Sequence, residues 1–169
     1  MSWLHSDLTR PVEAPLRSDA SGRRADLLAL VVAQFAPEHA ERYRRRDVTG
    51  DERAETFCNF FVADVTAALG APVPQRLANA QVEWLSSDEA RKRGWAEVSE
   101  HAAMGCVSEG MVCVVGWLNR NGGPGHVAVA VPSLDGERLY VAQAGARNFL
   151  AEPVRSGFGT LPVSYFVHP

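Results

Sequence analysis

The sequence predicts an α+β domain in which helices come first and an antiparallel sheet follows. Over residues 25–105, apolar side chains recur at helical spacing, and Gly or Pro residues separate the segments. From residue 111 onward the period changes to short valine-rich runs, which are typical of buried strands. Helices that precede the strands, rather than alternate with them, favour an antiparallel sheet.

The expected helices begin with residues 25–36, which Pro37 terminates, and a second short helix over residues 38–46. A third is expected over residues 56–69, with Thr56 as its N-cap and a glycine directly after it. The remaining helical segments are expected over residues 76–85, 87–93 and 101–105.

Four strands are expected, and Asp135-Gly136 is a strong signal for the hairpin turn between the middle two. A two-residue turn there pairs Ala128 with Gln143 across the hairpin. The expected strands are residues 111–117, 126–131, 138–144 and 163–167.

Length and composition fit one domain over residues 25–169, preceded by a loose arm over residues 1–24. The net charge of −3 gives no electrostatic reason to expect nucleic acid or an anionic membrane surface as a partner. The longest apolar run, residues 27–33, is far shorter than the ~20 residues that span a membrane. Residues 1–24 lack the apolar core of a classical signal peptide.

The three cysteines are Cys58, Cys106 and Cys113, and no two of them form a CxxC pair or a zinc-like spacing. A zinc site is therefore not expected, and no other metal and no cofactor are expected either. An odd number leaves at least one thiol free in a monomer. Cys106 and Cys113 are either buried as small hydrophobic residues or joined in a disulfide.

Cys58 lies in the first turn of the expected helix over residues 56–69. The free N–H groups and positive dipole end of a helix stabilise a thiolate, and the same groups can hold an oxyanion. This pattern favours a nucleophile, whereas the alternative is a buried cysteine on an apolar helix.

His126 opens a strand after the Gly-Gly-Pro-Gly segment, residues 122–125. Because side chains alternate along a strand, the expected hairpin places His126 and Gln143 on one face as diagonal neighbours. Gln143 would then orient the imidazole so that its other nitrogen accepts the thiol proton. Alternatively, Gln143 points into solvent.

Three segments resemble NlpC-type and CHAP-type cysteine peptidases and amidases. TFCNFFVADV (56–65) looks like their nucleophile helix, GHVAVA (125–130) resembles their histidine strand, and VAQAGARNF (141–149) is similar to the stretch with their third polar residue. The resemblance covers residues 55–167 and implies a papain-like fold that hydrolyses peptide or amide bonds of peptidoglycan. Many relatives have His, Asn, Asp or Glu as the third residue, so Asn148 is an alternative to Gln143.

Further candidates surround this set. Asn59 either donates a hydrogen bond to substrate or has no role beyond its place in the first helical turn. Trp117 either lines a substrate groove or packs in the core, and the same two alternatives apply to Trp84 and Trp95. Asp64 is expected to be a surface charge on the same helix.

The resulting hypothesis is a hydrolase that acts through an acyl-enzyme on the stem peptide of peptidoglycan, with Cys58, His126 and Gln143 as its triad. The alternatives are a catalytically silent wall-binding module and a transferase or deamidase that acts on a protein. Without a leader, the chain would be made in the cytoplasm and reach the periplasm or wall through a secretion apparatus or other non-classical delivery. An immunity or inhibitor protein is a possible partner.

Overall fold

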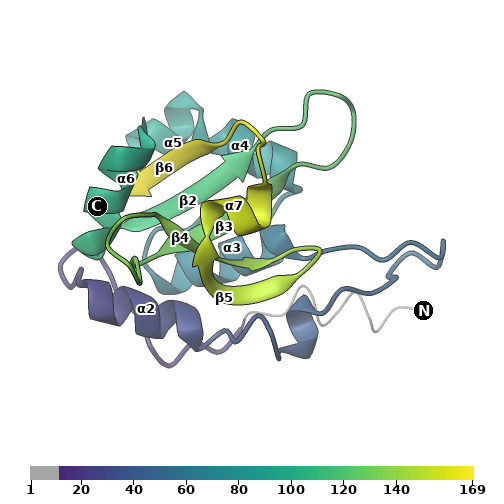
Figure 1. Cartoon of the computed structure of the whole chain (residues 1–169), viewed down its shortest axis with the longest axis horizontal. Helices are drawn as coiled ribbons and strands as arrows, with labels where there is room; N and C mark the ends of the chain where they lie inside the picture. The colour runs from purple at the N-terminus through teal and green to yellow at the C-terminus, as the bar shows by residue number, and fades with distance from the viewer. Residues whose placement is uncertain (1–11) are drawn as a thin grey trace.

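A six-stranded antiparallel sheet forms the centre of the molecule, with its strands in the order β1-β6-β2-β3-β4-β5 (Figure 1). The computed structural model describes residues 12–169, and its helices and antiparallel sheet confirm the expected α+β class. The strands are β1 (Ala96–Val98), β2 (Val112–Trp117), β3 (His126–Val131), β4 (Tyr140–Ala144), β5 (Asn148–Pro153) and β6 (Ser164–His168).

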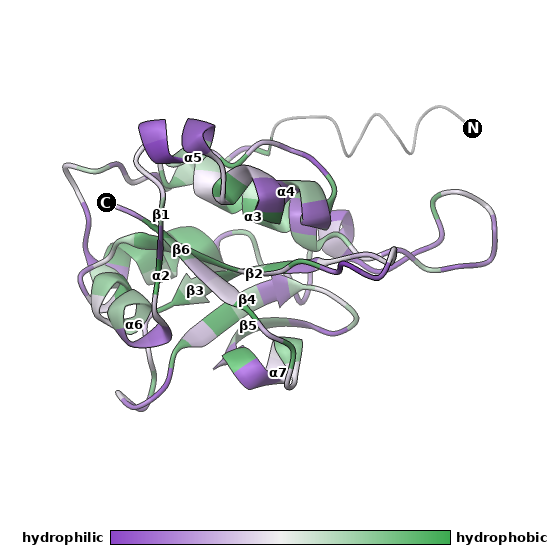
Figure 2. Cartoon of the chain, turned by 90° about the horizontal axis from the view of Figure 1, so that it is seen from above, coloured by the Kyte–Doolittle hydropathy of each residue, from purple (hydrophilic) through white to green (hydrophobic). Residues whose placement is uncertain are grey.

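Helices cover both faces of this sheet. Figure 2 shows α3, α4 and α5 on one side of it, and α6 and α7 on the other. Nearly every residue of β2, β3 and β4 is buried for this reason, which explains why these strands lack a polar face. The helical elements are α2 (Ala25–Ala33), the 3₁₀ turn η1 (Glu41–Tyr43), α3 (Cys58–Ala68), α4 (Ala78–Leu85), α5 (Asp88–Lys92), α6 (Glu100–Ser108) and α7 (Val154–Phe158).

Two glycines identify which strand residues face which helices. Gly116 pairs with Val127, and a Cβ at Gly116 would lie only 2.7 Å from a methyl group of Val82 on α4. On the opposite face, a Cβ at Gly157 of α7 would overlap the side-chain oxygen of Gln143. Val127 therefore faces α4, whereas Gln143 faces α7.

The hairpin register between β3 and β4 is the predicted one. Val129 pairs with Ala142, and Val131 pairs with Tyr140. The connection is longer than a two-residue turn, but Asp135 and Gly136 remain at its centre. Asp135 accepts hydrogen bonds from the backbone of Glu137 (2.9 Å) and Arg138 (3.1 Å), and so holds the loop in a form that preserves the register.

Several elements differ from the sequence-based expectation. Residues 38–46 form only the three-residue η1, because the backbone is already extended at Ala40 and at Arg44. The N-cap of α3 is Phe57 rather than Thr56. Helix α6 is longer than the expected turn and continues to Ser108, and the Ser99 hydroxyl caps its start by accepting a hydrogen bond from the Ala102 N–H (3.2 Å). No local sequence pattern predicted β1, β5 or α7.

The described part of the N-terminal arm is attached to the domain. Ser18 N–H donates to the Ala68 carbonyl (3.0 Å), and the Gln34 side chain binds both the N–H (3.0 Å) and the carbonyl (2.8 Å) of Leu16. Residues 1–11 of the expected loose arm lie outside the described residues. Within residues 12–169, no helix combines the length and apolar character needed to cross a membrane.

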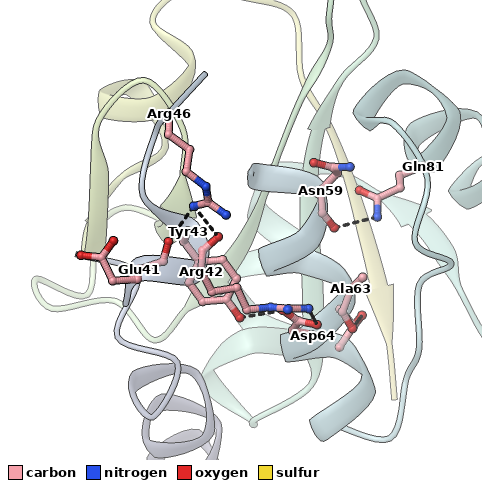
Figure 3. A network of polar contacts seen from close by, with 9 residues as sticks. Glu41, Arg42, Tyr43, Arg46, Asn59, Ala63, Asp64 and Gln81 are labelled. Carbon is pink, nitrogen blue, oxygen red and sulfur yellow. Dashed lines mark hydrogen bonds and ion pairs between the residues drawn. The ribbon is translucent and has the colours of Figure 1, made fainter. Parts of the chain in front are cut away.

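Asp64 is not the surface charge that its helix position suggested. Its side chain is only 13% exposed and accepts hydrogen bonds from Arg42 Nε (2.7 Å) and from the Tyr43 hydroxyl (2.7 Å), as Figure 3 shows. Burial raises the pKa of Tyr43, and the neighbouring Asp64 carboxylate acts in the same direction. The network fastens η1 to α3, so the helix that begins with Cys58 has a fixed position.

Candidate active site

Cys58 is the first residue of α3, as predicted, but its thiol is not the thiolate that the sequence suggested. The residue is 3% exposed, and this burial raises the pKa of the Cys58 thiol. Hydrogen bonding from the N–H groups of Val127 and Asn59, and from the Thr56 side chain, opposes the effect of burial without overcoming it. The helix start therefore lowers this pKa as expected, but burial outweighs it, so the prediction that the net pKa of the Cys58 thiol is lowered is wrong for the resting protein.

His126 and Gln143 meet as the strand parity predicted. His126 Nε2 and Gln143 Oε1 are 2.7 Å apart, and Gln143 Nε2 donates to the carbonyl of Arg147 (2.8 Å). A carboxamide oxygen can only accept a hydrogen bond, so His126 Nε2 must carry the proton of this pair. In the neutral imidazole, the lone pair then lies on Nδ1, which has no hydrogen-bond partner within residues 12–169.

Helix α7 fixes this pair from behind. The rings of His126 and Phe158 lie 4.7 Å apart, and Gly157 leaves room for the Gln143 oxygen. A Cβ at Gly145 would lie 3.0 Å from both Gln143 Nε2 and His126 Cε1. Burial lowers the pKa of His126, while the hydrogen bond with Gln143 acts in the opposite direction. The imidazole is therefore held neutral, oriented and largely shielded from water.

Sequence reasoning missed the contribution of α7. Its five residues contain Gly157 and show no helical periodicity, so no local signal connected them with His126. The contact depends on the path of the chain after β5, which the sequence pattern did not reveal.

The thiol and the imidazole approach the start of β3 from the two helical layers. Cys58 belongs to the α3 side of the sheet, whereas His126 contacts Phe158 on the α7 side (Figure 2). Both groups lie near the start of β3, because Cys58 interacts with the backbone N–H of Val127, the residue after His126. Within the described residues no hydrogen bond joins Cys58 to His126. Such contacts are often long in unliganded enzymes and tighten with substrate.

A cleft of about 650 Å³ opens beside the thiol and is called the Cys58 cleft below. Its walls are the residues before α3, the start of α4 and the glycine-rich loop before β3. The lining residues are Ala54, Glu55, Thr56, Cys58, Asn59, Leu77, Ala78, Asn79, Gly122, Gly123, Pro124 and Gly125. This volume lies within the range of about 300–1,000 Å³ that is usual for small-molecule sites.

Asn79 braces the loop that forms one wall of this cleft. Its Oδ1 accepts from the Asn119 N–H (2.9 Å), and its Nδ2 donates to the Gly123 carbonyl (3.0 Å). A Cβ at Gly125 would overlap Asn79 Oδ1 and lie 2.7 Å from the Trp117 carbonyl. Sequence analysis missed Asn79, and its only signal was a polar residue at the start of a short helix.

The predicted substrate contacts have different roles in the structure. The Asn59 side chain donates to the Arg76 carbonyl (2.8 Å), and its own carbonyl accepts from Gln81 (3.0 Å; Figure 3). Asn59 thus ties α3 to α4, although it also lines the Cys58 cleft. Trp117 is half-buried and lines a different cleft.

Asn148 is not the partner of the imidazole. Its Nδ2 donates to the carbonyls of Pro37 (2.8 Å) and Tyr43 (2.9 Å), so it anchors the segment around η1 to β5. Gln143, and not Asn148, therefore holds the position beside His126 that the third residue of the triad would occupy. Trp84 and Trp95 are buried in the core.

One acidic cluster within residues 12–169 has a metal-like arrangement. Oxygen atoms of Asp47, Asp51 and Glu55 lie within 4.8 Å of one another, and such oxygens suit a hard cation. These carboxylates already accept hydrogen bonds in their loop, including those of Gly50 N–H (2.6 Å) to Asp47 and Val48 N–H (2.8 Å) to Glu55. Their arrangement is accounted for by the turn that they stabilise.

All three cysteines are free thiols. Cys113 is fully buried, which raises its pKa, and the nearby Cys106 acts in the same direction. Comparison of the sequence with protein-family models and with curated proteins returns no match.

Proposed function

We propose that this protein is a cysteine hydrolase with a papain-like fold that cleaves a peptide or amide bond of bacterial peptidoglycan. The observation that carries the proposal is the arrangement at the start of β3. A thiol on the first turn of α3 interacts with the N–H of Val127, and the residue before Val127 is His126, whose imidazole Gln143 holds at 2.7 Å. The choice of peptidoglycan rests on the resemblance to NlpC-type and CHAP-type enzymes, and it places the substrate in the periplasm or wall.

The proposed reaction uses Nδ1 of His126 as the base. When substrate brings the two groups together, Nδ1 takes the Cys58 proton and the thiolate attacks the amide carbonyl. The oxyanion is held by N–H groups of the first turn of α3. His126 then gives its proton to the leaving amine. Water, deprotonated by His126, hydrolyses the thioester and restores the thiol.

Gln143 acts in this scheme as a positioning residue. It keeps the Nε2 proton in place, so that the basic lone pair stays on the nitrogen that faces no other partner. The neutral resting pair of thiol and imidazole is consistent with a proton transfer that occurs only with substrate in the cleft.

A second candidate is a catalytically silent module that binds wall peptides in the Cys58 cleft. The buried thiol with its raised pKa, and the lack of a hydrogen bond from Cys58 to His126 among the described residues, favour this alternative. A third candidate is a transferase or deamidase that uses the same residues on a protein. It is tested by comparing the wild type with Cys58→Ala on protein substrates.

The experiment is digestion of purified sacculi by the wild-type chain and by Cys58→Ala, with the released muropeptides analysed by mass spectrometry. New amine and carboxyl termini are expected from the wild type, and loss of a nucleophile should lower the rate by at least about 10³-fold. Cys106→Ala serves as the matched control, because that half-buried thiol lies on α6 and should leave the rate unchanged.

Each outcome decides between the candidates. Wall binding by the wild type without new termini would establish the silent module instead. Digestion that persists in Cys58→Ala would exclude this thiol as the nucleophile. Thermal unfolding of the variant should show a melting temperature within about 4 °C of wild type, since a small cavity costs about 1 kcal/mol.

A further inference from the structure

The loop between β2 and β3 ends directly before His126 and forms one wall of the Cys58 cleft. Figure 1 shows that this loop extends beyond the end of the sheet. Its sequence over residues 119–125 contains three glycines, which can adopt many backbone conformations, and Pro124, which has no N–H to donate. In the part of the chain that the structure describes, residues 119–124 make no backbone-to-backbone hydrogen bond. The shape of the loop therefore depends on side chains.

The first of these side chains belongs to the loop itself. Asn119 Oδ1 accepts a hydrogen bond from the Asn121 N–H (2.9 Å), and Asn119 Nδ2 donates to the Pro124 carbonyl (3.2 Å). A Cβ at Gly123 would lie only 2.7 Å from the same Nδ2 atom. These contacts fold the loop around the Asn119 carboxamide, but they do not attach it to another element.

Asn79, the second residue of α4, provides the attachment. Its Oδ1 accepts from the Asn119 N–H (2.9 Å), and its Nδ2 donates to the carbonyls of Asn119 (3.3 Å) and Gly123 (3.0 Å). The same carboxamide lies so close to Gly125 that a Cβ there would overlap Asn79 Oδ1. One side chain of α4 therefore contacts the beginning, the middle and the end of the loop.

The elements that Asn79 joins adjoin both reacting groups of the proposed enzyme. The loop continues directly into His126, the first residue of β3. Helix α4 is tied to α3 by the hydrogen bond from Gln81 Nε2 to the Asn59 carbonyl (3.0 Å), and α3 begins with Cys58. Asn79 thus connects the loop that precedes the base to the helical layer that carries the nucleophile.

We propose that Asn79 is a positioning residue for the reaction at Cys58. The inference rests on the proposed function and adds the group that fixes one wall of its cleft. By holding the loop against α4, Asn79 sets where the bound amide lies relative to the thiol and the imidazole. A substrate displaced by about 1 Å can react ~10²-fold more slowly, so a loosened wall has a large effect on rate.

The kinetic test compares full-length wild type and Asn79→Ala on soluble muropeptides. We expect kcat to fall at least tenfold with a smaller change in KM, because a misaligned substrate still binds but reacts more slowly. Asn79→Asp keeps the size and the acceptor atom but cannot donate to the two carbonyls when it is ionised, and should also lose activity. Asn121→Ala is the matched control, since this exposed side chain makes no hydrogen bond within residues 12–169.

A second measurement does not depend on activity. Backbone amide exchange of the Asn121 N–H should be severalfold faster in Asn79→Ala than in wild type, although its acceptor, Asn119 Oδ1, is still present. Exchange at Val129, in the centre of β3, should be unchanged, which separates release of the loop from a general loss of stability. Unchanged exchange at Asn121 would mean that Asn79 does not hold the loop.

The outcomes separate this inference from the proposed function. Cleavage that needs Cys58 but is as fast in Asn79→Ala as in wild type would overturn the positioning role alone. A rise in KM with an unchanged kcat would do the same, since Asn79 would then contribute only to binding. If no substrate is cleaved in a Cys58-dependent way, the proposed hydrolase is wrong and Asn79 positions no reaction, while amide exchange still decides whether it holds the loop.

Discussion

The two halves of the candidate site differ in how completely the fold prepares them. Gln143, Gly145, Gly157 and Phe158 fix the imidazole of His126 in orientation and tautomer. The thiol of Cys58 lies at the correct helix end, yet it is buried and neutral, and within the described residues it has no bond to the imidazole. This fold therefore preorganises the base, whereas the nucleophile still has to be activated.

The largest effect is expected from removing the support of the imidazole. Gln143→Ala should lower kcat/KM for wall substrate by about 10²–10⁴-fold, because the imidazole loses its preferred tautomer. Gln143→Glu should retain part of the activity. Its carboxylate stabilises the imidazolium and raises the pKa of His126, so the acid limb of the pH–rate profile should move to higher pH. If Gln143→Ala retained wild-type activity, catalysis would not depend on the orientation that Gln143 gives to the His126 imidazole.

The next effect concerns the thiol half. In the resting protein, iodoacetamide at neutral pH should alkylate the half-buried Cys106 about tenfold faster or more than Cys58, whose pKa is raised by burial. Cys113, which is fully buried and also has a raised pKa, should react most slowly. Peptide mapping by mass spectrometry measures the order, and fastest labelling at Cys58 would mean that the thiolate is already formed.

A smaller effect tests the packing behind the imidazole. A Cβ at Gly157 would overlap Gln143 Oε1, so Gly157→Ala should destabilise the fold by about 1–3 kcal/mol. Gly105→Ala is the matched control, since a Cβ there meets nothing within 4 Å and its helical position favours alanine by about 0.5–1 kcal/mol. Denaturant unfolding of both variants measures the difference. Equal stabilities would show that α7 does not constrain Gln143.

The smallest effect is a contribution of His126 to stability that depends on pH. Because burial lowers its pKa, the unfolded chain binds the proton more readily than the folded protein does. This contribution is fully present above pH 6.5, the ordinary value for histidine, and is lost as pH falls through the lower folded pKa. Melting temperatures measured from pH 7.5 to 5 should fall less steeply for His126→Gln than for wild type. If the melting temperatures of wild type and His126→Gln fell in parallel with pH, the pKa of His126 would not be lowered by folding, and its imidazole would be in contact with water.

Much of the imidazole half follows from local rules. Alternation along β3 and β4 places His126 and Gln143 on one face once the turn at Asp135-Gly136 sets the register. The position of Cys58 at a helix start follows from the apolar periodicity of α3. By contrast, Asn79 and Phe158 gave no usable signal, because their contacts join elements that are distant along the chain.

Local patterns were enough to predict the α+β class, the hairpin register and the pairing of His126 with Gln143, since helical and strand periods and turn residues act over a few neighbouring positions. Three features became known only from the folded structure: Cys58 is buried, Asn148 anchors η1 and Trp117 lines a second cleft. Burial and cleft formation depend on how layers of the fold pack together. No local pattern specifies that packing, so the state of the thiol could not be predicted from its position at a helix start.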